Sequence, residues 1–184
     1  MGIPTLIKTL TADGDDDLTF VHGTAGVVLD STYNEYMFVM TDINPATDET
    51  RFTFQVNVTS QSGYDESITS TTFKSKHLED GSGGEIVIDP YTDQYAGEGI
   101  VQDLVGDIGN GSDETMAGIL HLFNPSNTTY TTQFLAETST YTSDNGNRRT
   151  FLSGFVHATA AIIGIQFAMR SGAFDGVIQL YGIS

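Results

Sequence analysis

Apolar and polar residues alternate along much of this chain, and this period of two limits what the chain can fold into. The clearest run is RFTFQVNVTS, residues 51–60, in which Phe52, Phe54, Val56 and Val58 share one face. Successive side chains of a β-strand point to opposite faces, so the run predicts a strand with one buried face. No segment shows a convincing helical period, and we expect an all-β fold.

Similar runs recur along the chain, and we expect nine to eleven short strands. They lie at residues 4–12, 18–21, 25–30, 34–43, 67–76, 117–125, 129–141 and 148–160, with two more within 161–184. Loops of several residues separate many of them, which favours a two-sheet β-sandwich with Greek-key or jelly-roll-like connections. Residues 1–184 are expected to form a single domain, with residues 1–12 as either an N-terminal arm or an edge strand.

Two connecting segments carry specific expectations. Residues 77–116 are rich in Gly and Asp, and we interpret them as long loops around one or two short strands or a helical turn. The segment SDNGN, residues 143–147, predicts a hairpin, since Asn-Gly suits the positive φ angles of a type I′ turn.

The chain ends on AIIGIQFAMRSGAFDGVIQLYGIS, residues 161–184, two apolar runs around a glycine-rich turn. Four residues of the first run are expected to share one inward face: Ile163, Ile165, Phe167 and Met169. In the second run Ile178 and Leu180 would form the matching face. We expect the last strand to pair with its predecessor near the middle of a sheet.

The charge of the chain excludes several classes of partner. Asp and Glu number 24 against seven Lys and Arg, a formal net charge of -17. Binding to a nucleic-acid backbone or to an anionic membrane depends on Lys and Arg, so neither partner is expected. Any self-association must overcome repulsion by burying apolar area or by binding cations.

Motifs for catalysis and metal binding are incomplete. Asp13, Asp15 and Asp17 alternate as in a calcium loop, but Leu18 and Thr24 stand where an EF-hand needs Gly and Glu. The four histidines lack zinc-site spacing, there is no cysteine, and no nucleophile elbow or phosphate-binding loop occurs. We therefore assign no catalytic residue, metal ligand or cofactor, and expect no enzyme.

Three blocks resemble small virion proteins of tailed bacteriophages and prophages. They are residues 33–57, residues 118–130 and, most specifically, residues 158–184 with the ending LYGIS. The resemblance implies a jelly-roll protein of the head surface or of the tail and its fibres, and no catalytic residues.

Two virion functions stay open at this point. The first is a capsid decoration (cement) protein on the outer head surface, a homotrimer whose partners are the major capsid protein and its own copies. The alternative is a tail or tail-fibre component that binds host-surface glycan. Six apolar or aromatic residues are interface candidates: Ile3, Leu6, Tyr91, Tyr95, Tyr181 and Ile183.

Overall fold

Antiparallel β-strands make up the regular structure of the residues that are described. The computed structural model describes residues 2–59, 61–90, 92–95 and 101–184. Its twelve strands are β1 (Thr5–Asp15), β2 (Asp17–Val21), β3 (Glu35–Pro45), β4 (Thr50–Val58), β5 (Ile68–Leu78), β6 (Glu85–Ile88), β7 (Gln102–Ile108), β8 (Met116–Phe123), β9 (Gln133–Thr142), β10 (Gly146–Val156), β11 (Ile162–Met169) and β12 (Phe174–Ile183). The all-β prediction is confirmed. Within the described residues, no helix has the length and apolarity to cross a membrane.

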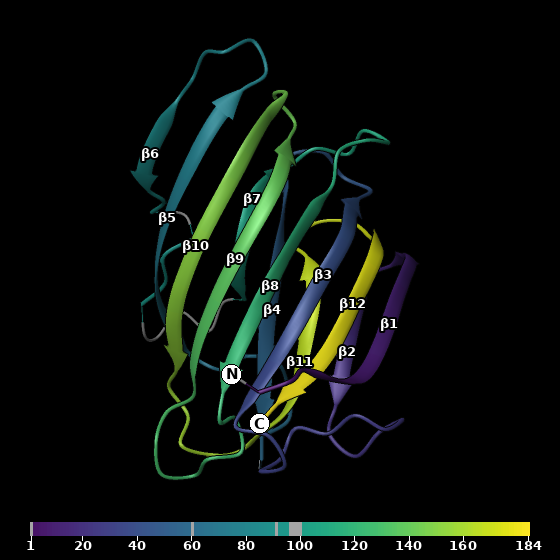
Figure 1. The fold of residues 1–184 in the computed structure, drawn as a ribbon, viewed down its shortest axis with the longest axis vertical. Helices are drawn as coiled ribbons and strands as arrows, with labels where there is room; N and C mark the ends of the chain where they lie inside the picture. Colours follow the sequence, from purple (N-terminus) through teal and green to yellow (C-terminus); the bar gives the residue numbers. More distant parts are fainter. Residues whose placement is uncertain (1, 60, 91, 96–100) are drawn as a thin grey trace.

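The strands lie in two layers (Figure 1). The first layer has the order β1-β12-β3-β8-β9-β10-β5-β6, and the second has the order β7-β4-β11-β2. One residue pair, Ile108 with Thr142, joins β7 to β9. All twelve strands therefore belong to one hydrogen-bonded sheet that folds over itself, and the pairing does not divide it into the two separate sheets that the sequence predicted.

The pairing is nested along the chain. β1 pairs with β12, β2 with β11, β3 with β8, and β4 with β7. Strands of the first half thus pair with strands of the second half in reverse order, which is the connection pattern of a jelly roll. The prediction that the last strand pairs with its predecessor was wrong. β11 and β12 lie in different layers, and β12 pairs with β1 and β3.

The core between the layers is aromatic. Phe167 of β11 lies with its ring centroid 5.4 Å from Phe38 of β3 in the opposite layer and 6.1 Å from Phe52 of β4. Phe20 of β2 completes the cluster at 6.3 Å from Phe167. As predicted, the alternating apolar side chains of residues 52–58 are fully buried, and burial of this area is the main stabilising term of the fold.

Three local expectations were wrong, each for a backbone reason. Residues 25–30 do not form a strand, since Ala25 (φ 50°) and Gly26 (φ 84°) are left-handed. A register shift near the start of β11 turns Ile162 inward and leaves Ile163 half-buried. The predicted β9–β10 hairpin is present, but Asn145 alone takes a positive φ (58°), so the turn is not type I′.

Four strands extend the first layer, and we call β9, β10, β5 and β6 the wing. Its inner face joins the core at Phe134 and Leu152, and further along the strands it is polar, with the side chains of Thr138, Thr140, Arg148 and Thr150 buried there. Arg148 donates a hydrogen bond of 2.8 Å to the carbonyl of Gly106 in β7. Asp89, Asp93 and Gln94 also contact this side, since backbone groups of β5 form hydrogen bonds with them. The interior of the wing is thus hydroxyl-rich, unlike the aromatic core.

Candidate functional site

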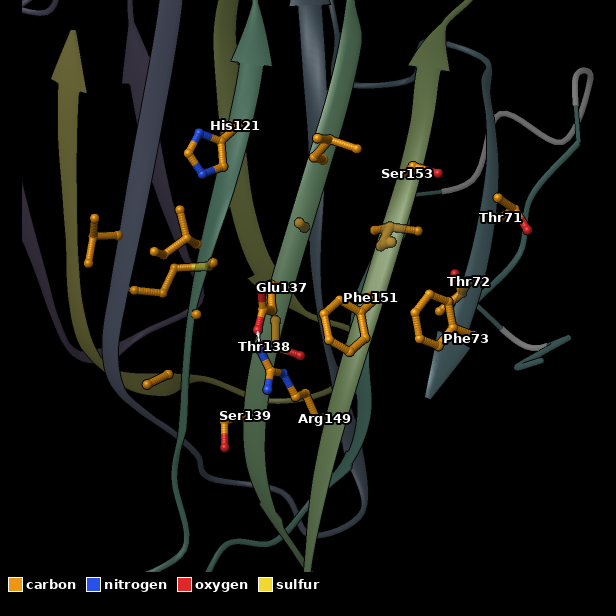
Figure 2. Close-up of a pocket in the computed structure, with 18 of the residues that line it drawn as sticks. Thr71, Thr72, Phe73, His121, Glu137, Thr138, Ser139, Arg149, Phe151 and Ser153 are labelled. Atoms are coloured by element: carbon orange, nitrogen blue, oxygen red, sulfur yellow. Dashed lines mark hydrogen bonds and ion pairs between the residues drawn. The ribbon is translucent and has the colours of Figure 1, made fainter. Parts of the chain in front are cut away.

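The outward side chains of the first layer form rows across the strands, and we call this surface the outer face. One row runs Ile88, Phe73, Phe151, Glu137, Ile119, each the direct cross-strand neighbour of the next. These residues line a groove of about 1150 Å³ that reaches from β3 across β8, β9 and β10 to β5 (Figure 2). The groove is the main candidate site of the described residues.

An aromatic and charged stack occupies the middle of the groove. The rings of Phe73 and Phe151 stack with centroids 4.7 Å apart and planes 15° apart. The guanidinium of Arg149 lies 4.7 Å from the ring centroid of Phe151 and forms an ion pair with Glu137 (Figure 2). Cation–π and ion-pair contacts thus hold Arg149 along the face, with its side chain still 54% exposed. The ion pair leaves the stack without net charge.

A second row connects the groove with the opposite end of the layer. It runs Leu135, His121, Met37, Tyr181, Leu6, again as direct cross-strand neighbours. The Nδ1 atom of His121 lies 2.5 Å from the Glu35 carboxylate. The outer face is therefore a largely apolar band that reaches from β1 to the wing.

The structure brings three of the six predicted interface residues onto this band. Leu6 and Tyr181 are cross-strand neighbours, and Ile183 lies two residues further along β12. Ile3 precedes β1 and is exposed. Tyr95 is exposed in the connection between β6 and β7, away from the others along the chain, and Tyr91 lies outside the described residues.

Sequence reasoning missed the large apolar residues of the groove, above all Phe73, Phe151 and Leu135 of the wing and Ile119 of β8. Alternation was visible in their strands, but it identifies two faces without saying which is inside. In FLAETSTY the threonines point inward and Leu135 points outward. The available signal was in β9, where Thr138, Thr140 and Thr142 share one side of the strand and Leu135 lies on the other.

Carboxylates of the described residues act as structural hydrogen-bond acceptors. Asp15 accepts a bond from the backbone amide of Asp13 (3.0 Å), and Asp175 accepts one from Gly14 (2.7 Å), so both stabilise the β1–β2 turn. Among the residues that the structure describes, no three His, Asp or Glu side chains are grouped so as to hold a metal ion. The calcium-like motif thus folds as an acidic turn.

One titratable group at the end of the outer face is perturbed. The hydroxyl of Tyr141 donates a hydrogen bond of 2.9 Å to Glu79. This bond to a carboxylate is the main cause that raises the pKa of Tyr141, with further contributions from desolvation and nearby acids. The group is therefore a neutral donor around neutral pH.

Comparison with known proteins identifies no relative. No model of a protein family matches the chain, and no curated protein matches it. A crystal structure of a protein of unknown function from Bacteroides ovatus is similar over 82% of this chain, with 10% identity and a TM-score of 0.21. This chain spans about half of that protein, 47% of its length. A similarity of this size carries no argument.

Proposed function

We propose that this chain is a non-enzymatic structural protein of a tailed-bacteriophage virion, a capsid decoration protein on the outer head surface. The observation that carries the proposal is the set of large apolar side chains across the outer face, on a chain with a net charge of -17. The resemblance of residues 33–57, 118–130 and 158–184 to virion proteins supports the assignment to a phage particle. In this function the outer face and its margins contact capsid subunits and other copies.

The charge distribution supports a place on the outside of a particle. Acidic residues are concentrated in two stretches of the sequence, Asp13–Asp17 and residues 77–116. A surface of this sign stays hydrated and repels packaged nucleic acid, so it suits the solvent side of the shell. Contact with neighbours must then come from apolar burial, which the outer face supplies.

The groove supports binding more than hydrolysis. Glu137 is the one carboxylate among the described residues that line it, and Arg149 neutralises it. Hydrolysis of a glycosidic bond normally needs two carboxylates across a cleft. A groove with one paired carboxylate and a stacked Phe pair supplies contact area instead.

The test is the number of copies per virion. Purified particles of the phage or induced prophage that encodes the chain would be analysed by quantitative mass spectrometry against the major capsid protein. We expect hundreds of copies per particle. About a dozen copies would support a tail position instead, and particles free of the chain would refute a virion function.

A tail or fibre component that binds host glycan is the second candidate, and one observation favours it. Ser139, Asn147 and Ser153 line the groove beside Phe151, so hydroxyl and amide groups stand next to an aromatic ring. Sugars bind to such combinations. Glycan-array binding by the isolated protein, lost on Phe151→Ala but kept on Tyr95→Ala, would support this candidate; an array without signal would remove it.

A further inference from the structure

The part of the wing around Phe73 and Thr138 has large apolar side chains outside and hydroxyl side chains inside, whereas Phe134 and Leu152 are buried on the inner face nearer the core. Phe73, Leu135 and Ile88 are exposed on the outer face, whereas Thr138 and Thr150 are buried beneath it. A strand at the surface of a free monomer normally shows the reverse alternation. The wing therefore has the side-chain pattern of a layer that is covered on its outer face.

We infer that the outer face of the wing is the surface through which copies of this chain pack against one another. The inference deepens the proposed function, since it names the contact surface for one of the proposed partners. Its occupant is a second copy of the chain, and the groove lined by Phe73, Phe151, Leu135 and Ile119 is buried in that contact.

Charge is the first reason to assign a second copy. The outward positions of the wing strands carry one acid and one base, Glu137 and Arg149, and these pair with each other. The chain as a whole carries -17. Two such molecules repel least where their local charge is zero, so the wing is the surface on which they approach most easily. A basic partner would be attracted to the acidic connections instead.

Exposed area is the second reason. The exposed fractions are 49% for Phe73, 49% for Leu135, 69% for Ile88 and 78% for Ile86. These four side chains present about 400 Å² per copy, at the roughly 150–200 Å² that a fully exposed large side chain offers. A stable interface of standard size takes about 800 Å² from each partner. These four side chains thus supply about half of the area that one partner needs, and Phe151, Ile119 and the polar residues between them add to it.

The register explains how the contact extends beyond the wing. Leu135 is in one row with Tyr181 and Leu6 at the other end of the layer. Copies that meet at the wing therefore have an apolar margin next to the contact, which a further copy or a capsid subunit would cover. Self-association and attachment to the shell use neighbouring parts of one face.

The experiment uses the full chain and measures its mass by sedimentation equilibrium from 1 to 100 µM protein at physiological salt. We expect a closed oligomer. Leu135→Glu places a like charge in each copy of the contact and is expected to raise the dissociation constant at least tenfold. The matched control is Tyr130→Glu, a change at a 73% exposed residue in the connection before β9, and it should alter the constant less than twofold. Melting temperatures of both variants report whether they fold.

A second measurement uses the absence of cysteine from the chain. Ser139→Cys lies in the groove, and Ser112→Cys lies in the connection before β8. We expect the thiol at position 139 to react with a thiol reagent several-fold more slowly at 100 µM than at 1 µM protein, and the thiol at position 112 to react equally at both.

Three results would overturn the inference: a monomer at 100 µM, an oligomer that Leu135→Glu leaves intact, or equal reactivity of the thiol at position 139 at both concentrations. The proposed function fails separately. A monomer present in hundreds of copies per virion would reject the wing contact alone, whereas a wing-dependent oligomer missing from virions would reject the virion function alone.

Discussion

One buried carboxylate joins three strands of the second layer, and its removal is expected to be costly. Asp103 of β7 has a side chain only 1% exposed. Its Oδ2 atom accepts a hydrogen bond of 2.8 Å from Arg51 of β4, and its Oδ1 atom accepts one of 2.6 Å from Arg170, directly after β11. The carboxylate therefore holds β7, β4 and the end of β11 together.

Asp103→Asn keeps the shape of the side chain and removes its charge. Burial by itself lowers the pKa of Arg51, but the hydrogen bond and charge of Asp103, with other acids, raise it above its ordinary value. In the variant both guanidinium groups remain charged and lose their buried anion. The Arg51 and Arg170 side chains are 30% and 36% exposed, so water offsets part of the loss, and the cost is about 2–3 kcal/mol, below that of a fully buried pair. In a domain of this size 1 kcal/mol corresponds to about 2–4 °C, so we expect Tm to fall by about 4–12 °C.

Thermal melts followed by circular dichroism would measure this loss. The control is Asp16→Asn, which removes the same charge from an exposed position between β1 and β2 and is expected to change Tm by less than about 1 °C. The loss should persist in 0.5 M NaCl, because salt screens buried pairs weakly. A Tm within about 2 °C of the wild type would show that Asp103 does not hold the layer as inferred.

Three further predictions address pH, packing and the C-terminus. Burial of the Glu66 carboxyl, and to a lesser extent the charge of Asp65, raises the pKa of Glu66 above its ordinary 4.5. The protonated form therefore stabilises the fold below pH 4.5, and this stabilisation is lost as the pH rises through the folded-state pKa. Glu66→Gln should therefore raise Tm at pH 7 and leave it unchanged at pH 3.5, and equal effects at both pH values would contradict this. A Cβ at Gly182 would lie 2.2 Å from the Tyr33 ring, so Gly182→Ala should lower the free energy of unfolding, measured in urea, by about 1–3 kcal/mol. The control is Gly84→Ala, where the nearest atom to the added Cβ is 3.6 Å away and almost no loss is expected. Deletion of residues 181–184 removes the end of a strand that pairs on both sides, so the truncated chain should melt well below the full chain; unchanged melting would rule out a structural role for this ending.

Much of the fold was predictable because it follows from short-range pattern. Phe52 and Phe54 could be assigned to a buried face from alternation alone, and the strand class followed from the lack of a helical period. The failures came where a single backbone angle overrides the pattern. Ala25 is an example, since its positive φ ends an extended run that its apolar neighbours would otherwise favour.

The candidate site was less predictable than the fold. Leu6, Tyr181 and Ile183 were selected as apolar residues near the chain ends, and the structure places them on one face because β1 and β12 pair. Phe73 and Phe151 are 78 positions apart in the numbering, and they stack only because β5 pairs with β10. Pairs at such separation leave no mark in a single sequence.

The sequence by itself determined that this chain forms strands, that its core is aromatic, and that its surface is acidic. These properties depend on residue type and on the alternation of apolar and polar residues, both of which can be seen in short stretches of sequence. Only the tertiary structure decided which side of each wing strand is inside, because that choice depends on which elements cover it. β7, Asp89, Asp93 and Gln94 lie against the inner side. Leu135, Phe73 and Phe151 are therefore left on the outer face, and the proposed contact between copies follows from that placement.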